Sequence, residues 1–255
     1  MDETSLQEKR MRAIFIVGTG RSGTHFTTRL LNGFEHTNDP MKGKEDPNLL
    51  MDIANAAIHH RLPSRNSERV YRHRIMHEDG VFLDQHHPNL FFVNHWSTLF
   101  EGVVFLYPQR PIYQTVASML RHRGVMSWYR YAKGWRQRTI NRIPYPNRFL
   151  GLEQFSDVQS LPPHLLCAHR VIAHQKAYEG SVAMMNGALR SIDYVSLVNN
   201  PLEEFSRVFS AKEITRLGKF SLVEQPSPQS LSKYKDVLSE KEVAEINALG
   251  RTLYG

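Results

Sequence analysis

Three glycines and an arginine follow a short apolar segment near the start of the chain, and together they could bind an anion. The apolar segment, residues 13–17, predicts a buried strand, and an amphipathic stretch at 24–31 predicts a helix directly after the glycines. The glycines are Gly18, Gly20 and Gly23. Backbone N–H groups in such a turn, with the positive end of the helix dipole, form an anion site. Arg21 places a fixed positive charge inside the same turn.

The turn resembles a P-loop, but Thr24 stands where a P-loop carries the lysine that contacts the β- and γ-phosphates. The run Arg-Ser-Gly-Thr instead resembles the 5′-phosphosulfate loop of sulfotransferases that use 3′-phosphoadenosine-5′-phosphosulfate (PAPS). That family often has a second Thr or Ser where this chain has His25. The resemblance implies that the donor is bound by Gly20, Arg21, Ser22, Gly23, Thr24 and His25. The alternative is an ordinary strand-to-helix turn without a ligand.

A second apolar segment, 103–107, leads to Arg110, and an amphipathic helix is predicted at 111–122. Arginine offers a planar set of donors to phosphate, and a hydroxyl adds one more. PAPS-dependent sulfotransferases bind the 3′-phosphate with an Arg at the end of such a strand and a Ser eight residues later. Arg110 and Ser118 have this spacing, although the neighbouring Pro is shifted and Tyr113-Gln114 replaces the family's Arg-Asp pair. Alternatively, Arg110 only caps its own strand.

A third segment resembles the family near Tyr194, which is followed by Asn200 and Pro201 as a helix start. The resemblance implies that Tyr194 lies against the adenine nucleotide, whereas a half-buried tyrosine at a strand end is the alternative. The Arg-Lys-Gly loop that completes the 3′-phosphate site in cytosolic animal sulfotransferases is not visible. Lys219 and Lys233 are the candidates to replace it.

The resemblance also nominates a general base, because these enzymes carry Lys-Thr-His-Leu-Pro at the position of residues 84–88. His86, two residues before Pro88, would take the acceptor proton, and Arg21 would stabilise the charge on the leaving phosphate. Asp84 replaces the family's lysine, so the sequence does not show which residue would bring a second positive charge to the sulfuryl group. Other candidates for the base are Glu35, Asp39, Glu45 and His87.

Apolar and amphipathic segments alternate along the chain. We predict strands at 13–17, 81–84, 103–107 and 192–198, and helices near 24–33, 111–122, 164–190, 201–209 and 239–253. This alternation predicts a three-layer α/β domain, with a central parallel sheet flanked by helices and ligands at the C-terminal ends of the strands. The family resemblance implies a P-loop NTPase-like sulfotransferase fold over 1–255 as a single domain.

Composition restricts the possible partners. The 32 Lys and Arg against 25 Asp and Glu give a net charge of +7, which suits a polyanionic ligand. The charge is dispersed and no nucleic-acid-binding motif appears, so nucleic acid is not expected. The single Cys167 and the charged N-terminus, together with the absence of any stretch near the roughly 20 apolar residues of a membrane span, predict a cytoplasmic location. His73 and His77 have metal-ligand spacing, but Arg72 and Arg74 surround them, so no metal is predicted.

The segment 121–148 interleaves aromatic and basic residues. It is interpreted either as a substrate-side segment or as a solvated helix that buries its tryptophans. The function predicted from these observations is sulfuryl transfer from PAPS, without a metal, to a hydroxyl or amine of a small-molecule, sugar or lipid acceptor. The alternatives are a P-loop kinase or NTPase, for which Asp84 is the one candidate Mg²⁺ carboxylate, and a non-catalytic nucleotide-binding protein.

Overall fold

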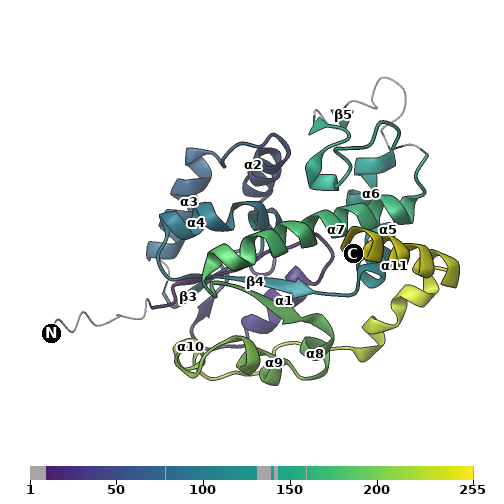
Figure 1. Ribbon diagram of the computed structural model, residues 1–255. Coiled ribbons are helices and arrows are strands. Elements are labelled where there is room, and N and C mark those ends of the chain that lie inside the picture. Colours follow the sequence, from purple (N-terminus) through teal and green to yellow (C-terminus); the bar gives the residue numbers. More distant parts are fainter. Residues whose placement is uncertain (1–9, 78, 131–138, 141–142, 159, 255) are drawn as a thin grey trace.

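A five-stranded parallel sheet forms the centre of the molecule in the computed structural model, which describes residues 10–77, 79–130, 139–140, 143–158 and 160–254 (Figure 1). The strand order is β2-β3-β1-β4-β7. The strands are β1 (Ala13–Ile16), β2 (Thr37–Asn38), β3 (Val81–Asp84), β4 (Val103–Gln109) and β7 (Leu189–Asp193). Ile14 pairs with Leu83 on one side and with Val104 on the other. The predicted three-layer α/β class is therefore confirmed.

Helices cover both faces of the sheet. One layer consists of α1 (Thr24–Leu31), α8 (Tyr194–Asn199), α9 (Pro201–Val208) and α10 (Ala211–Leu217). Against the other face lie α2 (Pro47–Ile58), α3 (Arg65–His77), α4 (Val93–Leu99), α5 (Ile112–Leu120), α6 (Arg123–Arg130), α7 (Pro163–Val182) and α11 (Glu240–Tyr254). A separate hairpin pairs β5 (Thr139–Ile140) with β6 (Ile143–Pro144).

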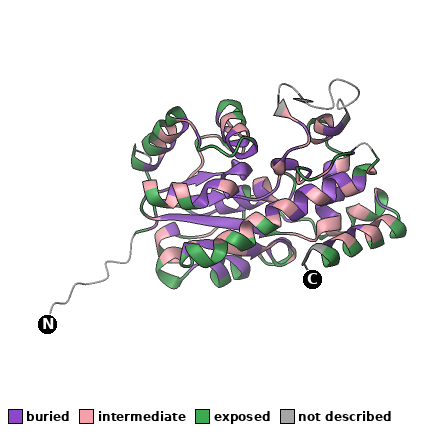
Figure 2. Ribbon diagram, turned by 45° about the horizontal axis from the view of Figure 1, so that its top comes forward, coloured by how far each residue is buried: buried purple, intermediate pink, exposed green. Residues whose placement is uncertain are grey.

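The three central strands β3, β1 and β4 are buried on both faces because their side chains alternate between two apolar cores (Figure 2). Phe15 and Phe105 point to the layer that contains α7, and their rings meet edge to face with centroids 5.6 Å apart. Ile14 and Leu106 point to the layer that contains α1. Burying each such side chain contributes about 1.5–3 kcal/mol, which explains why β1 and residues 103–107 of β4 are continuously apolar.

The expected strand at 192–198 is wrong. The strand ends at Asp193, whose carboxylate accepts a hydrogen bond of 2.7 Å from the backbone N–H of Ser196 and so caps α8. The expected helix at 164–190 ends earlier, because α7 stops at Val182 and the chain then turns into β7. Apolar periodicity alone does not separate a strand from a short, capped helix.

Helices α2 and α3 occupy a region where the sequence suggested no element. The start of α2 has a clear local cause: the Asp46 carboxylate accepts hydrogen bonds from the N–H groups of Asn48 and Leu49, with Pro47 in the first turn. At the other end of the chain, a capping box begins α11. The Ser239 hydroxyl bonds the backbone of Glu242, whose carboxylate bonds back to the Ser239 N–H at 2.8 Å.

Candidate functional site

The loop between β1 and α1 has a backbone that only particular residues tolerate. Gly23, the residue before α1, has φ 113°, and a Cβ there would lie 2.6 Å from two ring carbons of Tyr194. Gly18 has φ 146°, and Arg21 adopts φ 78°. A non-glycine residue at positive φ is uncommon and often marks a functional turn. The loop therefore combines close packing against Tyr194 with a strained arginine.

Two hydroxyl groups of the loop are buried without a hydrogen-bond partner. They are Oγ1 of Thr19 and Oγ of Ser22, whose residues are at most 3% exposed. The N–H groups in the first turn of α1 lack intrahelical partners, as at every helix start. Burying an unsatisfied polar group costs about 1–3 kcal/mol, so unpaired hydroxyls beside a helix N-terminus suit a polar ligand.

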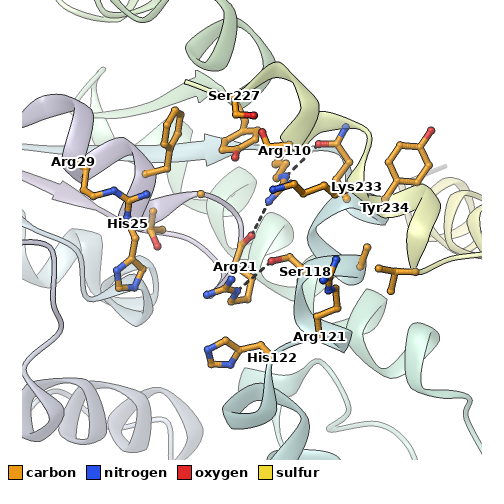
Figure 3. A pocket seen from close by; sticks show the side chains of 18 of the residues that line it. Arg21, His25, Arg29, Arg110, Ser118, Arg121, His122, Ser227, Lys233 and Tyr234 are labelled. Atoms are coloured by element: carbon orange, nitrogen blue, oxygen red, sulfur yellow. Dashed lines mark hydrogen bonds between the residues drawn. The ribbon is translucent and has the colours of Figure 1, made fainter. Parts of the chain in front are cut away.

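Arg21, Arg110 and Ser118 come together although the sequence places them on separate elements (Figure 3). Nε of Arg21 donates to Oγ of Ser118 at 3.2 Å, and Nη1 of Arg110 donates to the carbonyl oxygen of Arg21 at 3.3 Å. The guanidinium of Arg110 also lies over the Tyr194 ring, 4.4 Å from its centroid. The C-terminal ends of β1, β4 and β7 thus bring all three expected anion motifs to one place.

These residues line a pocket of about 780 Å³. Its wall carries five cationic side chains, Arg21, Arg29, Arg110, Arg121 and Lys233, against two carboxylates, Glu224 and Asp236. Arg29 pairs with Glu224, so the remaining charge is strongly positive. Aromatic rings of Phe26, Tyr194 and Tyr234 also face it. Of the two lysines that the sequence suggested, Lys233 lines this pocket, whereas Lys219 is not among the described residues that do so.

On the other side of the loop, His87 and Glu45 form a pair beside Gly20. Nδ1 of His87 lies 3.1 Å from Oε1 of Glu45, and a Cβ on Gly20 would lie 3.3 Å from Nε2 of His87. His25 lies near the same carboxylate, with Nε2 at 3.8 Å from Oε2. The candidate base positions Glu45 and His87 are therefore next to the loop.

The charges of this pair follow from its surroundings. Burial alone would raise the pKa of Glu45, but the hydrogen bond from His87 and nearby positive charge lower it to about 2. Burial lowers the pKa of His87, and the positive charge of Arg170 lowers it further, against the opposing effect of Glu45. At neutral pH the stable arrangement is an ionised Glu45 that accepts the Nδ1 proton of a neutral His87. The lone pair of Nε2 then faces Gly20 and the guanidinium of Arg170, whose Nη2 lies 3.5 Å away.

His86 lies deeper, 1% exposed, within a buried polar network. Its Nδ1 is 2.7 Å from the Asp84 carboxylate, and its Nε2 faces the backbone of Asp46, 2.8 Å from the nitrogen. Burial lowers the pKa of His86, but the charge and hydrogen bond of Asp84 outweigh it, so that the pKa lies above its ordinary value. Asp84 also accepts hydrogen bonds from Tyr71 and Asn89. Both carboxylate oxygens of Asp84, the candidate Mg²⁺ ligand, thus already accept hydrogen bonds within the protein.

The two remaining carboxylate candidates make contacts within loops. Glu35 accepts a hydrogen bond from the backbone of Lys219 at 3.2 Å. Asp39 accepts from the side chain of Asn32 and from the backbone of Met41 and Gly43. Both carboxylates therefore shape backbone turns, and neither is among the described residues that line the 780 Å³ pocket.

Part of the aromatic and basic segment 121–148 lies outside the described residues, including Tyr131, Lys133, Trp135, Arg136 and Arg138. Its described beginning includes α6, where Tyr129 is buried and the Trp128 ring lies 6.0 Å from that of Phe149. Arg121 and His122, just before α6, line the pocket. The described part of the segment therefore contains a helix with a buried aromatic residue, and the interpretation as a substrate-side segment stays a prediction.

The sequence did not point to Arg170, which is 3% exposed on α7 and reaches the loop. A Cβ on Gly20 would lie 3.5 Å from Nη2 of Arg170. A charged residue on an apolar helix is the signal that could have drawn attention to it, since arginine is almost never fully buried without a partner. His73 and His77 are exposed on α3, and within the described ranges no three His, Cys, Asp or Glu residues gather as a metal site.

No protein-family model and no curated protein matches the sequence. The structure is similar to the sulfotransferase domain of the Synechococcus PCC 7002 olefin synthase, with a TM-score of 0.50 and 11% identity over 95% of this chain and 96% of that one. A sulfotransferase domain from the curacin biosynthetic pathway gives a TM-score of 0.49 and 13% identity, covering 94% of this chain and 98% of that one. At such identities the likeness concerns the fold. None of the described helices is long and apolar enough to cross a membrane.

Proposed function

We propose that this protein is a sulfotransferase that takes a sulfuryl group from PAPS. One observation carries the proposal: the anion loop at β1, Arg110 at β4 and Tyr194 at β7 meet in a single cationic pocket. Each of these was expected from its own resemblance to the family, and contact between them was not required by any single motif. The similarity of fold to a sulfotransferase domain supports the same reading.

The residues present fit a 3′,5′-bisphosphorylated adenine nucleotide. Its 5′ end needs donors and cations, which the unpaired Ser22 hydroxyl, the start of α1 and Arg21 can provide. A second phosphate needs a separate cationic group, for which Arg110 and Lys233 are available with the Ser118 hydroxyl. The volume of about 780 Å³ lies within the usual range for ligand pockets.

When bound, PAPS supplies a sulfuryl group: the acceptor oxygen or nitrogen forms a bond to sulfur, and the bond from sulfur to the phosphate oxygen breaks with its electron pair on that oxygen. Arg21 and the loop N–H groups would bind the phosphate and stabilise the charge that develops there. Ser118 would keep Arg21 aligned through the 3.2 Å hydrogen bond. This chemistry does not require the P-loop lysine or a carboxylate for Mg²⁺.

Of the proton acceptors suggested by the sequence, we propose His87 as the base and Glu45 as the residue that positions it. A neutral imidazole whose Nδ1 proton is held by a carboxylate keeps Nε2 basic and correctly oriented, as in other histidine–carboxylate pairs. Nε2 of His87 lies beside Gly20, whereas Nε2 of His86 faces the backbone of Asp46. His86 stays a competing prediction, and the pH profile discussed below separates the two.

The nucleotide is tested first, by calorimetry and thermal unfolding with 3′-phosphoadenosine-5′-phosphate (PAP) against ATP and Mg²⁺. We expect micromolar binding of PAP, on the order of −8 kcal/mol, and a rise in melting temperature with added PAP. Stronger stabilisation by ATP with Mg²⁺ would contradict the proposal and favour a kinase or NTPase. Transfer is tested with labelled PAPS against hydroxyl and amine acceptors of the sugar, lipid, phenol and peptide classes.

A further inference from the structure

Arg170 is a buried cation whose charge no described residue neutralises. It lies on α7, is 3% exposed, and its Nε has no hydrogen-bond partner. No ion pair within 4.0 Å joins it to a carboxylate in the part of the chain that the structure describes. Its Nη2 lies 3.5 Å from Nε2 of His87, which is at the limit of a hydrogen bond.

The other groups around Arg170 are uncharged at neutral pH. Burial raises the pKa of Cys167 to about 12 and raises that of Tyr129, so neither supplies a negative charge. Burial and the charge of Arg170 lower the pKa of His174 to about 3, and they also lower that of His87. The carboxylate of Glu45 contacts Nδ1 of His87, the ring nitrogen opposite the one that Arg170 approaches.

An aromatic contact does not replace the missing partner. The guanidinium lies over the Phe149 ring, 4.7 Å from its centroid. Such a contact contributes about 2 kcal/mol when desolvated. The cost of burying an unpaired ion is several kcal/mol, so the arrangement is costly unless an anion binds there. A buried arginine kept at this cost next to the loop points to a ligand.

The position of Arg170 relative to the loop identifies the ligand group. Nη2 would lie 3.5 Å from a Cβ on Gly20, so the guanidinium faces the loop where a side chain is lacking, one residue before Arg21. Arg21 itself turns away to Ser118 on α5. Arg170 on α7 therefore brings a second cation to the loop, on the side of Gly20.

Resting on the proposed function, we propose that Arg170 binds the sulfuryl group of PAPS by donating hydrogen bonds to its terminal oxygens. It thereby takes the role left open by Asp84, which occupies the position of the family's lysine. The guanidinium keeps its protons throughout, because it stabilises the negative charge of the transferred group and does not take part in proton transfer. A Cβ on Gly20 would lie 3.5 Å from Nη2, so a side chain there would take up part of the space in front of the guanidinium.

The proposal is tested by comparing two nucleotides that differ in the sulfuryl group alone. Calorimetry gives the affinities of wild type and Arg170→Met for PAPS and for PAP. We expect the substitution to weaken PAPS binding by about 10–100-fold, as for loss of a charge-assisted hydrogen bond, and PAP binding by less than about 3-fold. Arg110→Gln is the matched control, because it should weaken both nucleotides by the same factor.

The melting temperature without ligand provides a second readout. Methionine fills the space of the arginine without a charge, and replacing an uncompensated buried ion in this way is often neutral or stabilising. We therefore expect Arg170→Met to melt at or above the wild-type temperature. If Arg170→Met does not fold, the affinities of Arg170→Gln for PAPS and PAP are compared with those of Arg170→Lys. The lysine keeps a positive charge, so Arg170→Lys should lose less affinity for PAPS than Arg170→Gln.

The outcomes distinguish this inference from the proposed function. Equal losses for PAPS and PAP, or unchanged affinity for both with a raised KM for the acceptor, would overturn the role of Arg170 on the sulfuryl group. The second result would make Arg170 an acceptor-binding residue. If the wild-type protein bound neither nucleotide, the proposed function itself would fail.

Discussion

Nδ1 of His87 lies 3.1 Å from Oε1 of Glu45, a residue 42 positions earlier in the chain. The next residue, His86, forms its own pair with Asp84 at 2.7 Å. Two adjacent histidines thus each have a carboxylate, but they face different surroundings: His87 faces the loop at Gly20, and His86 faces the backbone of Asp46. Their pKa values shift in opposite directions from 6.5, which makes the two distinguishable.

The pH dependence of turnover should identify the base. A base must be neutral to accept a proton, so the rate falls when the pH drops below its pKa. Because burial and Arg170 lower the pKa of His87, we expect an acidic limb below pH 6.5. If His86 were the base, its raised pKa would place the limb above 6.5. The measurement is kcat/KM between pH 4.5 and 9 at saturating PAPS.

Two variants make this test specific. His87→Ala should lower turnover by about 10²–10⁴-fold and remove the limb, with little change in PAPS affinity. Glu45→Gln should move the limb to still lower pH, since the Glu45 carboxylate raises the pKa of His87. An unaltered profile in both variants would contradict the assignment, and loss of the limb in His86→Gln alone would support His86.

A second prediction concerns the 3′-phosphate. Arg110→Ala should weaken PAP binding by roughly 2–4 kcal/mol, because a charge-assisted contact is lost. Ser118→Ala should weaken PAP binding by about 1 kcal/mol, and it also removes the 3.2 Å hydrogen bond that Nε of Arg21 donates to Ser118. Calorimetry with adenosine-5′-phosphosulfate, which lacks the 3′-phosphate, is the control. Equal losses with both nucleotides would mean that Arg110 acts on the fold or on the acceptor.

Lys233 and Lys219 form a matched pair for a third prediction. Lys233 lines the pocket, whereas Lys219 contacts Glu35 through its backbone nitrogen. Lys233→Gln should weaken PAP binding by about 0.5–1 kcal/mol, the scale of an exposed charge contact, and more at low salt than at high salt. Lys219→Gln should leave the affinity unchanged. A reversed result would place the second phosphate away from the short helical turn at Lys233–Asp236.

The sequence predicted the elements around the candidate site most reliably where local chemistry sets local structure. The apolar run before Gly18 and the amphipathic run after Gly23 define β1, the loop and α1, while Arg110 directly follows β4 and Ser118 lies on α5. Parallel strands then bring these ends together as a class property of the fold. For these residues a short window of sequence contains the necessary information.

The contacts that distant parts of the chain make with the loop could not be predicted in this way. Arg170 reaches Gly20 from α7, 150 positions along the chain, and Glu45 reaches His87 from the turn before α2. Which of two adjacent histidines faces the loop depends on how the chain leaves β3, and Asp84 fixes this by pairing with His86. Such contacts depend on tertiary packing, and apolar periodicity gives no information about it.

A fourth prediction compares two glycines of the loop. Gly23→Ala should lower the stability of the protein by about 1–3 kcal/mol, because its φ of 113° is strained and its Cβ would meet the Tyr194 ring at 2.6 Å. Gly20→Ala meets Nε2 of His87 at 3.3 Å, a tight contact to which the His87 side chain must adjust, so it should cost less stability than Gly23→Ala and also lower turnover. Thermal unfolding and kcat measured on both variants check the contrast. Equal stability losses would contradict it.

The last prediction concerns the buried network around His86. Because the folded-state pKa of His86 is raised above 6.5, its protonation contributes stability that is complete below pH 6.5 and is lost as the pH rises through the folded-state pKa. His86→Ala should therefore destabilise the protein by about 3–5 kcal/mol, since Asp84 is left as an unpaired buried carboxylate. The difference in melting temperature between wild type and His86→Ala should shrink from pH 6 to pH 9.

Asp84→Asn is the control for this network, since the charge of Asp84 is what raises the pKa of His86. It should remove most of that pH dependence, and its single amide oxygen can keep one of the two contacts that Asp84 accepts, from Tyr71 on Oδ1 or from Asn89 on Oδ2. If the difference between wild type and His86→Ala instead grew with pH, His86 would be buried in its neutral form. In both wild type and His86→Ala, buried neutral histidines such as His174 lower the free energy of unfolding as the pH falls below 6.5, because they gain protons on unfolding.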